Sequence, residues 1–258
     1  MITIAIANQK GGVGKTTTAI NIATAMAATG WKTLLIDLDP QGNASTGMGV
    51  RAEERTTSSY DLLVDGLPVG ECTVASSIPG LDIIPATQDL SGAEVELVSI
   101  EDRTDRLRQA LDGYKDHDVC FIDCPPSLGL LTLNALSAAD TLLVPLQCEF
   151  FALEGLSQLL QTVERVQQRF NPDLGIIGVA LTMFDRRNRL TDQVADDVRD
   201  CLGELVFQSV IPRNVRLSEA PSHGLPALVY DHSCAGSRAY MALARELIGR
   251  LPEQRKAA

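Results

Sequence analysis

Short apolar runs alternate along the chain with longer stretches in which apolar residues recur at every third or fourth position. A short apolar run predicts a buried strand, whereas recurrence at this spacing predicts an amphipathic helix. Ala19, Ile22, Ala23 and Met26, for example, share one helical face shortly after the first apolar run. The pattern predicts strands at residues 2–7, 32–37, 81–85, 118–123, 141–145, 174–181 and 206–211.

Helices are predicted in the intervals between these strands. Alternation of the two is typical of the α/β class, in which helices cover both faces of a mostly parallel, twisted sheet. A chain of 258 residues, 45% of them apolar, can bury such a core as one domain over residues 1–258. Residues 44–79 carry no clear pattern. Beyond the first helix, we expect helices within residues 90–112 (one or two), 130–138, 153–170, 190–203 and 240–251.

The composition excludes several classes of protein. No apolar run approaches the roughly 18 residues that span a bilayer, and Met1 leads directly into the first strand, so we expect a cytoplasmic protein without a signal peptide. A net charge of −11 argues against a generally basic nucleic-acid binder. The cysteines and histidines form no metal or catalytic pattern, so we expect reduced, mostly buried thiols and surface or capping imidazoles. They are Cys72, Cys120, Cys124, Cys148, Cys201, Cys234, His117, His223 and His232.

The strongest chemical signal is a glycine-rich turn between the first strand and the first helix. Glycines there let backbone N–H groups close around a phosphate, and the helix N-terminus adds partial positive charge. In this motif Lys15 reaches the β- and γ-phosphates, and the Thr16 hydroxyl ligates Mg²⁺. The sequence therefore predicts a single P-loop NTPase domain, with phosphates bound by Gly11, Gly12, Val13, Gly14, Lys15, Thr16 and Thr17.

Two acidic residues lie where strands end. Asp123 closes an apolar strand, as a Walker B aspartate does, and is predicted to hold Mg²⁺ through a water molecule. The alternative is a carboxylate that caps the next helix. Asp39 lies in the turn after the second strand, at the edge where open α/β sheets bind ligands. The alternative for Asp39 is a turn-forming side chain before Pro40.

The loop departs from the general P-loop pattern at one end. Gln9 occupies the position of the first glycine, and Lys10 follows it. A second lysine here is the signature of the deviant Walker A group, so the chain resembles the ParA/Soj partitioning ATPases, the MinD division-site ATPases and the nitrogenase iron proteins. The resemblance implies that Lys10 crosses a dimer interface to the partner's phosphates. It also implies that Asp39 orients or activates the attacking water, with Asp37 supporting the site from behind, so the expected catalytic residues are Lys10, Lys15 and Asp39.

Three blocks, residues 9–42, 124–127 and 210–222, resemble the chromosomal ParA/Soj group in particular. This resemblance implies that Met183, Pro212 and Asn214 lie against the adenine base. It further implies that Arg187 and Arg216 contact DNA without sequence preference. Charge alone does not indicate a DNA surface, because residues 186–216 hold six arginines against five acids, a net of only +1.

The resemblance implies an ATP-dependent partitioning ATPase that requires ATP and Mg²⁺. ATP binding is expected to form a sandwich homodimer that binds double-stranded DNA on the nucleoid, and a ParB-type centromere-binding partner is expected to stimulate hydrolysis and release. A MinD-like membrane role would need a terminal amphipathic basic helix, and residues 252–258 offer no apolar face. An iron-protein role would need cysteines that bind an iron–sulfur cluster. Only Cys124 and Cys148 are near the right strand ends, and the residues that flank them do not match the motifs of that family. A small-molecule ligase or kinase is a weaker alternative.

Overall fold

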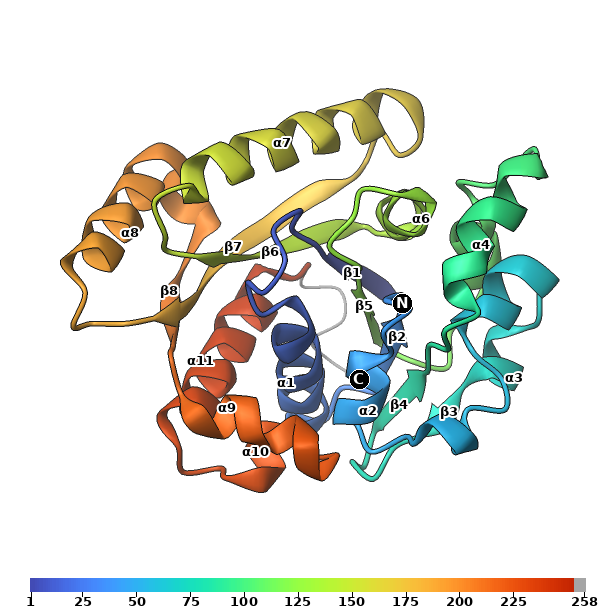
Figure 1. Cartoon of the computed structure of the whole chain (residues 1–258), viewed down its shortest axis with the longest axis horizontal. Coiled ribbons are helices and arrows are strands. Elements are labelled where there is room, and N and C mark those ends of the chain that lie inside the picture. Colours follow the sequence, from blue (N-terminus) through green and yellow to red (C-terminus); the bar gives the residue numbers. More distant parts are fainter. Residues whose placement is uncertain (253–258) are drawn as a thin grey trace.

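The computed structural model, which describes residues 1–252, is built around one eight-stranded sheet (Figure 1). The strands run in the order β3-β4-β2-β5-β1-β6-β7-β8, and all neighbours are parallel except β3 and β4. The predicted mostly parallel α/β sheet is therefore confirmed. The strands are β1 (Ile2–Ile6), β2 (Thr33–Asp37), β3 (Val74–Ala75), β4 (Leu81–Ile84), β5 (Val119–Asp123), β6 (Thr141–Gln147), β7 (Gly175–Phe184) and β8 (Val206–Pro212).

Helices cover both faces of the sheet, with α1 and α11 on one side and α6, α7 and α8 on the other (Figure 1). Residues 90–112 contain two α-helices, which agrees with the prediction of one or two helices there. The helices are α1 (Lys15–Ala28), α2 (Asn43–Gly47), α3 (Val69–Cys72), α4 (Leu90–Glu96), α5 (Arg106–Leu111), α6 (Leu130–Ala138), α7 (Ala152–Arg169), α8 (Arg189–Leu202), α9 (Val215–Glu219), α10 (Ala227–Tyr230) and α11 (Ala235–Arg250).

The hydrophobic core forms two layers because strand side chains alternate between the faces of the sheet. Ile4 and Ile6 of β1 pack with α1 and α11, whereas Ala5 packs in the opposite layer with α4 to α8. Helix α1 is buried on nearly every side, at eleven of its fourteen residues, because α11 also packs against it. The sequence pattern predicted one apolar face for α1 and so underestimated how much of this helix is buried. The last helix, α11, adds buried residues to the same layer and packs against α1 and β8.

Residues 44–79, which the hydrophobic pattern left unassigned, contain several short elements. Helix α2 follows the turn after β2, and β3 adds an antiparallel edge strand to β4. A 3-10 turn covers Ala52–Glu54 and a π-helical turn covers Asp61–Asp65. These elements are too short to show a period, so they form through contacts with the sheet rather than through a local pattern.

One expectation about the histidines was wrong. His117 is buried, and its ring nitrogens lie 2.9 Å from the Tyr114 hydroxyl and 2.9 Å from Asp82 Oδ2. The cysteines are all free, and four of the six are buried, as expected. Among the described residues no helix is long and apolar enough to cross a membrane. Most of the terminal segment weighed against a membrane role, residues 253–258, lies outside the described part of the chain.

Candidate nucleotide site

The glycine-rich loop joins β1 to α1 and presents open space to a ligand. Gly12 and Gly14 have positive φ angles of 76° and 85°, which L side chains rarely adopt. A Cβ atom added at Gly11 or Gly12 would meet nothing within 4 Å. Gly14 is the N-cap of α1 and provides no side-chain cap, so the first backbone N–H groups of the helix remain free for an anion.

Lys15 opens helix α1 at the floor of this loop. The side chain is buried, and its Nζ donates a hydrogen bond of 3.2 Å to the backbone carbonyl of Lys10. Burial lowers the pKa of Lys15, and the charges of Asp123 and Asp39 partly oppose that shift. A buried ammonium with one neutral acceptor is suited to receive the negative charge of a phosphate.

Asp123 ends β5 directly beside this lysine. It is fully buried, and neither carboxylate oxygen has a hydrogen-bond partner among the described residues. Burial, and then the charge of Asp37, raise its pKa well above the ordinary value, while the Thr16 hydroxyl and Lys15 partly offset this. The helix-cap alternative fails, because α6 begins only at Leu130 and its N-cap is Gly129. An unpaired buried carboxylate beside a threonine hydroxyl fits the oxygen ligands that Mg²⁺ prefers.

The two acids at the end of β2 and in the turn after it have different environments. Asp37 is paired in register with Asp123 and accepts hydrogen bonds from Ser45 N (2.8 Å), Ser45 Oγ (2.6 Å) and Asp39 N (3.1 Å). Burial raises the pKa of Asp37 to about 6, although these hydrogen bonds oppose the shift. Asp39 is 8% exposed, and its Oδ1 accepts a hydrogen bond of 3.0 Å from Gln41 N. Asp37 therefore supports the turn from behind. The bond from Gln41 N to Asp39 is the contact expected of a turn-forming side chain, which was the alternative role for Asp39.

Two residues that sequence reasoning missed hold this turn in place. The Ser45 hydroxyl donates to Asp37 and accepts from the backbone N–H of Ala86, which ties the turn to the end of β4. The Arg55 guanidinium donates to the backbone carbonyls of Ala86, Gly42 and Val50 and to the Thr46 hydroxyl. Both residues lie in the segment without periodicity, where no sequence signal distinguishes them.

A cavity of about 400 Å³ lies beside the loop, between the ends of β7 and β8. Met183, Pro212 and Asn214, the three predicted base-flanking residues, all line it together with Gly14 and Thr17. Met183 has a φ of 50°, a strained conformation for a residue with a side chain. Thr182 fastens β7 to the loop through a 2.8 Å hydrogen bond from its Oγ1 to the carbonyl of Val13.

Tyr240 of α11, which no sequence motif indicated, also lines the cavity. Its hydroxyl lies 3.1 Å from Thr18 Oγ1 of α1 in a fully buried contact. This contact links the last helix of the chain to the helix that follows the phosphate loop.

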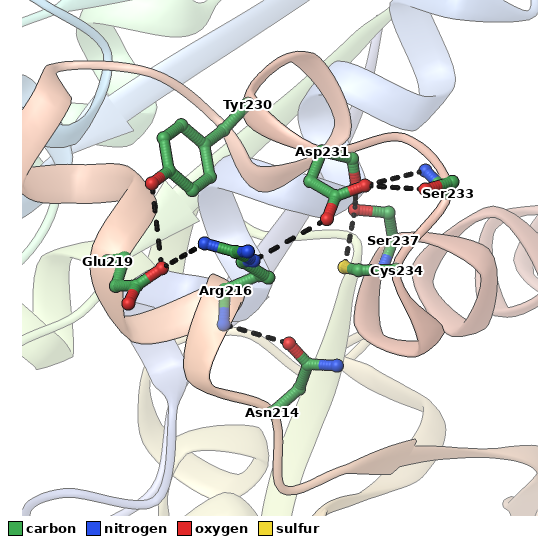
Figure 2. A network of polar contacts seen from close by, with 8 residues as sticks. All are labelled: Asn214, Arg216, Glu219, Tyr230, Asp231, Ser233, Cys234 and Ser237. Atoms are coloured by element: carbon green, nitrogen blue, oxygen red, sulfur yellow. Dashed lines mark hydrogen bonds and ion pairs between the residues drawn. The ribbon is translucent and has the colours of Figure 1, made fainter.

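The remaining predicted residues lie outside this enclosed space. Lys10, at the mouth of the loop, forms an ion pair with Glu149 just after β6, and both side chains are partly exposed. Arg187 lies in the exposed loop between β7 and α8. Arg216 lies on α9 within the polar network that Figure 2 shows. The structure thus brings the phosphate, metal and base residues together and leaves the arginines on the surface.

Comparison with known proteins decides the family. A family model described as an AAA domain matches residues 1–176. The chromosome partitioning protein ParA of Caulobacter vibrioides is 59% identical over 250 residues, which cover 96% of this chain and 94% of that protein. The chain belongs to the ParA/Soj family of ATPases. Another member, the sporulation initiation inhibitor protein Soj of Bacillus subtilis, is 52% identical over 245 residues, or 95% of this chain and 97% of that protein.

Solved structures agree with the predicted fold and cofactors. The cobyrinic acid a,c-diamide synthase of Mycobacterium smegmatis superposes with a TM-score of 0.82 and 38% identity, covering 96% of this chain and 94% of that one. That protein was crystallised with ADP and magnesium and with an ATP analogue and magnesium. The predictions of a P-loop NTPase fold and of the ParA/Soj family are therefore confirmed, and the nucleotide and magnesium bound in that relative agree with the predicted ATP and Mg²⁺.

Proposed function

We propose that this ATPase partitions DNA by switching between a free chain and an ATP-bound sandwich dimer. The observation that carries the proposal is the convergence of an open phosphate loop, the unpaired Asp123 and a base-sized cavity on one edge of the sheet. ATP bound there would lie with its base near Met183 and Asn214 and its phosphates on the loop. We assign residues 1–258 to this one ATPase domain.

The residues divide into three roles. Lys15 and the loop would hold the phosphates, Lys10 would contact those of the partner chain, and Asp39 would orient the attacking water. Thr16 and Asp123 would hold Mg²⁺, which when bound neutralises charge on the phosphates. A ParB-type partner would stimulate hydrolysis and so release the dimer from nucleoid DNA in the cytoplasm.

Asp123→Asn is expected to stabilise the nucleotide-free protein while weakening its response to magnesium. The substitution replaces a buried carboxylic acid, whose charged form burial and the neighbouring Asp37 disfavour, with a neutral amide, so the melting temperature should rise by about 2–6 °C. The additional rise that Mg²⁺ gives in the presence of ATP should disappear. Differential scanning fluorimetry measures both quantities, with the exposed α8 variant Asp196→Asn as a control that should change neither. A full magnesium response in Asp123→Asn would place the metal elsewhere.

DNA binding with ATP, with ADP and without nucleotide is the experiment that tests the proposal. If Arg187 and Arg216 of both chains each meet one phosphate, four contacts give a slope of log K against log salt of about −3.6. Arg216→Glu should remove at least about two units of that slope and weaken every DNA sequence alike. ATP-dependent dimerisation should survive, because Arg216 lies outside the phosphate loop. An unchanged slope and affinity would place the DNA surface elsewhere.

The competing functions have weaker support. A role in small-molecule synthesis would follow the Mycobacterium smegmatis protein, which is named a diamide synthase, but that protein is 38% identical against 59% for the Caulobacter ParA. An iron-protein role would need accessible cysteines, but Cys124 and Cys148 are both buried. Co-sedimentation with liposomes distinguishes a MinD-like membrane role from the proposed one. We expect the ATP-bound protein to remain in the supernatant.

A further inference from the structure

Arg187 is already occupied by a carboxylate of its own chain. Its Nε lies 2.9 Å from Asp185 Oδ1, and a terminal guanidinium nitrogen lies 2.9 Å from Asp185 Oδ2. This two-point contact is the geometry in which a guanidinium also binds a phosphate. The Arg187 side chain is 88% exposed, so this ion pair lies at the surface of the chain.

Arg216 is held in the same way by two carboxylates (Figure 2). Its terminal nitrogen donates to Glu219 Oε2 at 2.8 Å, and its Nε lies 3.6 Å from Asp231 Oδ2. The guanidinium carbon also lies 6.0 Å from the centre of the Tyr230 ring, whose hydroxyl donates to the same Glu219 oxygen at 3.5 Å. One terminal nitrogen and Nε of this guanidinium therefore face carboxylates of its own chain.

Two of these acidic residues, Asp185 and Asp231, are themselves fixed in place. Asp231 Oδ1 accepts hydrogen bonds from Ser233 N (3.1 Å) and Ser233 Oγ (2.8 Å), and Asp185 Oδ1 accepts one from Arg187 N (3.1 Å). Hydrogen bonds from Arg187 lower the pKa of Asp185 to about 2, and those from Ser233 lower the pKa of Asp231. Both carboxylates are therefore charged throughout the neutral range.

Both arginines follow closely after the segments that flank the base cavity. Asp185 and Arg187 come directly after Met183 and the end of β7. Asn214 lines the cavity and also caps α9, where its Oδ1 accepts a 2.9 Å hydrogen bond from the backbone N–H of Arg216. The two arginines thus belong to the two chain segments, after β7 and after β8, that also contribute residues to the cavity lining.

We propose that Asp185, Glu219 and Asp231 act as built-in competitors of the DNA backbone for Arg187 and Arg216. The inference rests on the proposed function, because it assumes that these arginines contact DNA. Binding then requires each guanidinium to exchange a carboxylate of its own chain for a phosphate. Exposed ion pairs are weak enough to exchange, and the paired charges explain how an acidic chain avoids DNA until a dimer doubles the contacts.

The test is DNA affinity of the combined variant Asp185→Asn, Glu219→Gln and Asp231→Asn, measured with ATP at about 0.1 M salt. The amides keep an acceptor oxygen, so the turns and the fold should persist, which thermal melting checks. We expect at least about tenfold tighter binding than wild type. The matched control neutralises three exposed acids of α8, Asp196, Asp197 and Asp200, and changes the net charge by the same amount.

A double-mutant cycle separates a local effect from a general charge effect. The same three amides are introduced into a chain that carries Arg187→Gln and Arg216→Gln, where the gain should vanish. A gain that persists there, or one equal to that of the α8 control, overturns the inference while the DNA-binding function stands. Wild-type protein that binds no DNA with ATP overturns the proposed function instead, and the inference with it.

Discussion

Lys10→Ala is expected to abolish ATP-dependent dimerisation and hydrolysis while leaving nucleotide binding by the single chain intact. The loop residues around Lys15 would still hold the phosphates, but the charge that reaches the partner's nucleotide would be lost. Removing a cation that stabilises the transferred phosphoryl group in this way costs about 10³-fold or more in rate. Light scattering with ATP reports the dimer, phosphate release reports the rate, and a fluorescent nucleotide reports binding.

Glu149→Gln is the matched control for this experiment. In the free chain Lys10 pairs with Glu149, so the alanine variant also loses an intrachain ion pair. Glu149→Gln breaks the same pair but keeps the lysine, and it should still dimerise with ATP. A Lys10→Ala protein that dimerises normally would remove the proposed role across the interface. Equal loss in both variants would assign the effect to the intrachain pair.

The phosphate and metal residues could be predicted from the sequence because their signals are local. The loop from Gly11 to Thr17 needs only a strand before it and a helix after it, and both are visible as apolar patterns. Asp123 ends a run of buried residues, so its place at the sheet edge follows from strand length alone. The structure adds that this carboxylate is unpaired, which no pattern reveals.

The base cavity and the support of the acidic turn depend on contacts between distant parts of the chain. Met183 and Asn214 approach the loop only because β7 and β8 are neighbours in the sheet, and the family resemblance rather than periodicity indicated them. Tyr240 comes from the last helix, more than two hundred residues from its partner Thr18. Arg55 acts through backbone carbonyls, which every residue possesses, so its partners leave no trace in the sequence.

The same limit applies to the arginines. The sequence between residues 186 and 216 shows a net charge of only +1, which suggests an ordinary solvated face. Counting charges does not reveal that Arg187 and Arg216 each meet specific carboxylates, two of which, Asp185 and Glu219, lie just outside that interval. Pairing is a property of three-dimensional geometry, and here it decides whether a basic side chain is available to a phosphate.

Asp39→Ala is expected to stop hydrolysis and to accumulate the ATP-bound dimer, because the contacts of Lys15 and Thr16 with the nucleotide do not require this carboxylate. Removing the group that positions the water should lower turnover by about 10²-fold or more. Phosphate release measures the rate, and light scattering measures how long the dimer persists after one addition of ATP.

Asp39→Asn distinguishes water positioning from turn formation. The asparagine side chain can still accept the hydrogen bond that Gln41 N donates to Asp39 Oδ1, so the turn should remain. An amide oxygen accepts a hydrogen bond from water more weakly than a carboxylate and cannot take the proton of the attacking water, so the asparagine variant should turn over at least about 10²-fold more slowly than wild type. Wild-type turnover in Asp39→Asn, together with loss in Asp39→Ala, would make Asp39 a turn residue. Another group would then hold the water, and the buried Asp37 directly behind the turn would be the next residue to substitute.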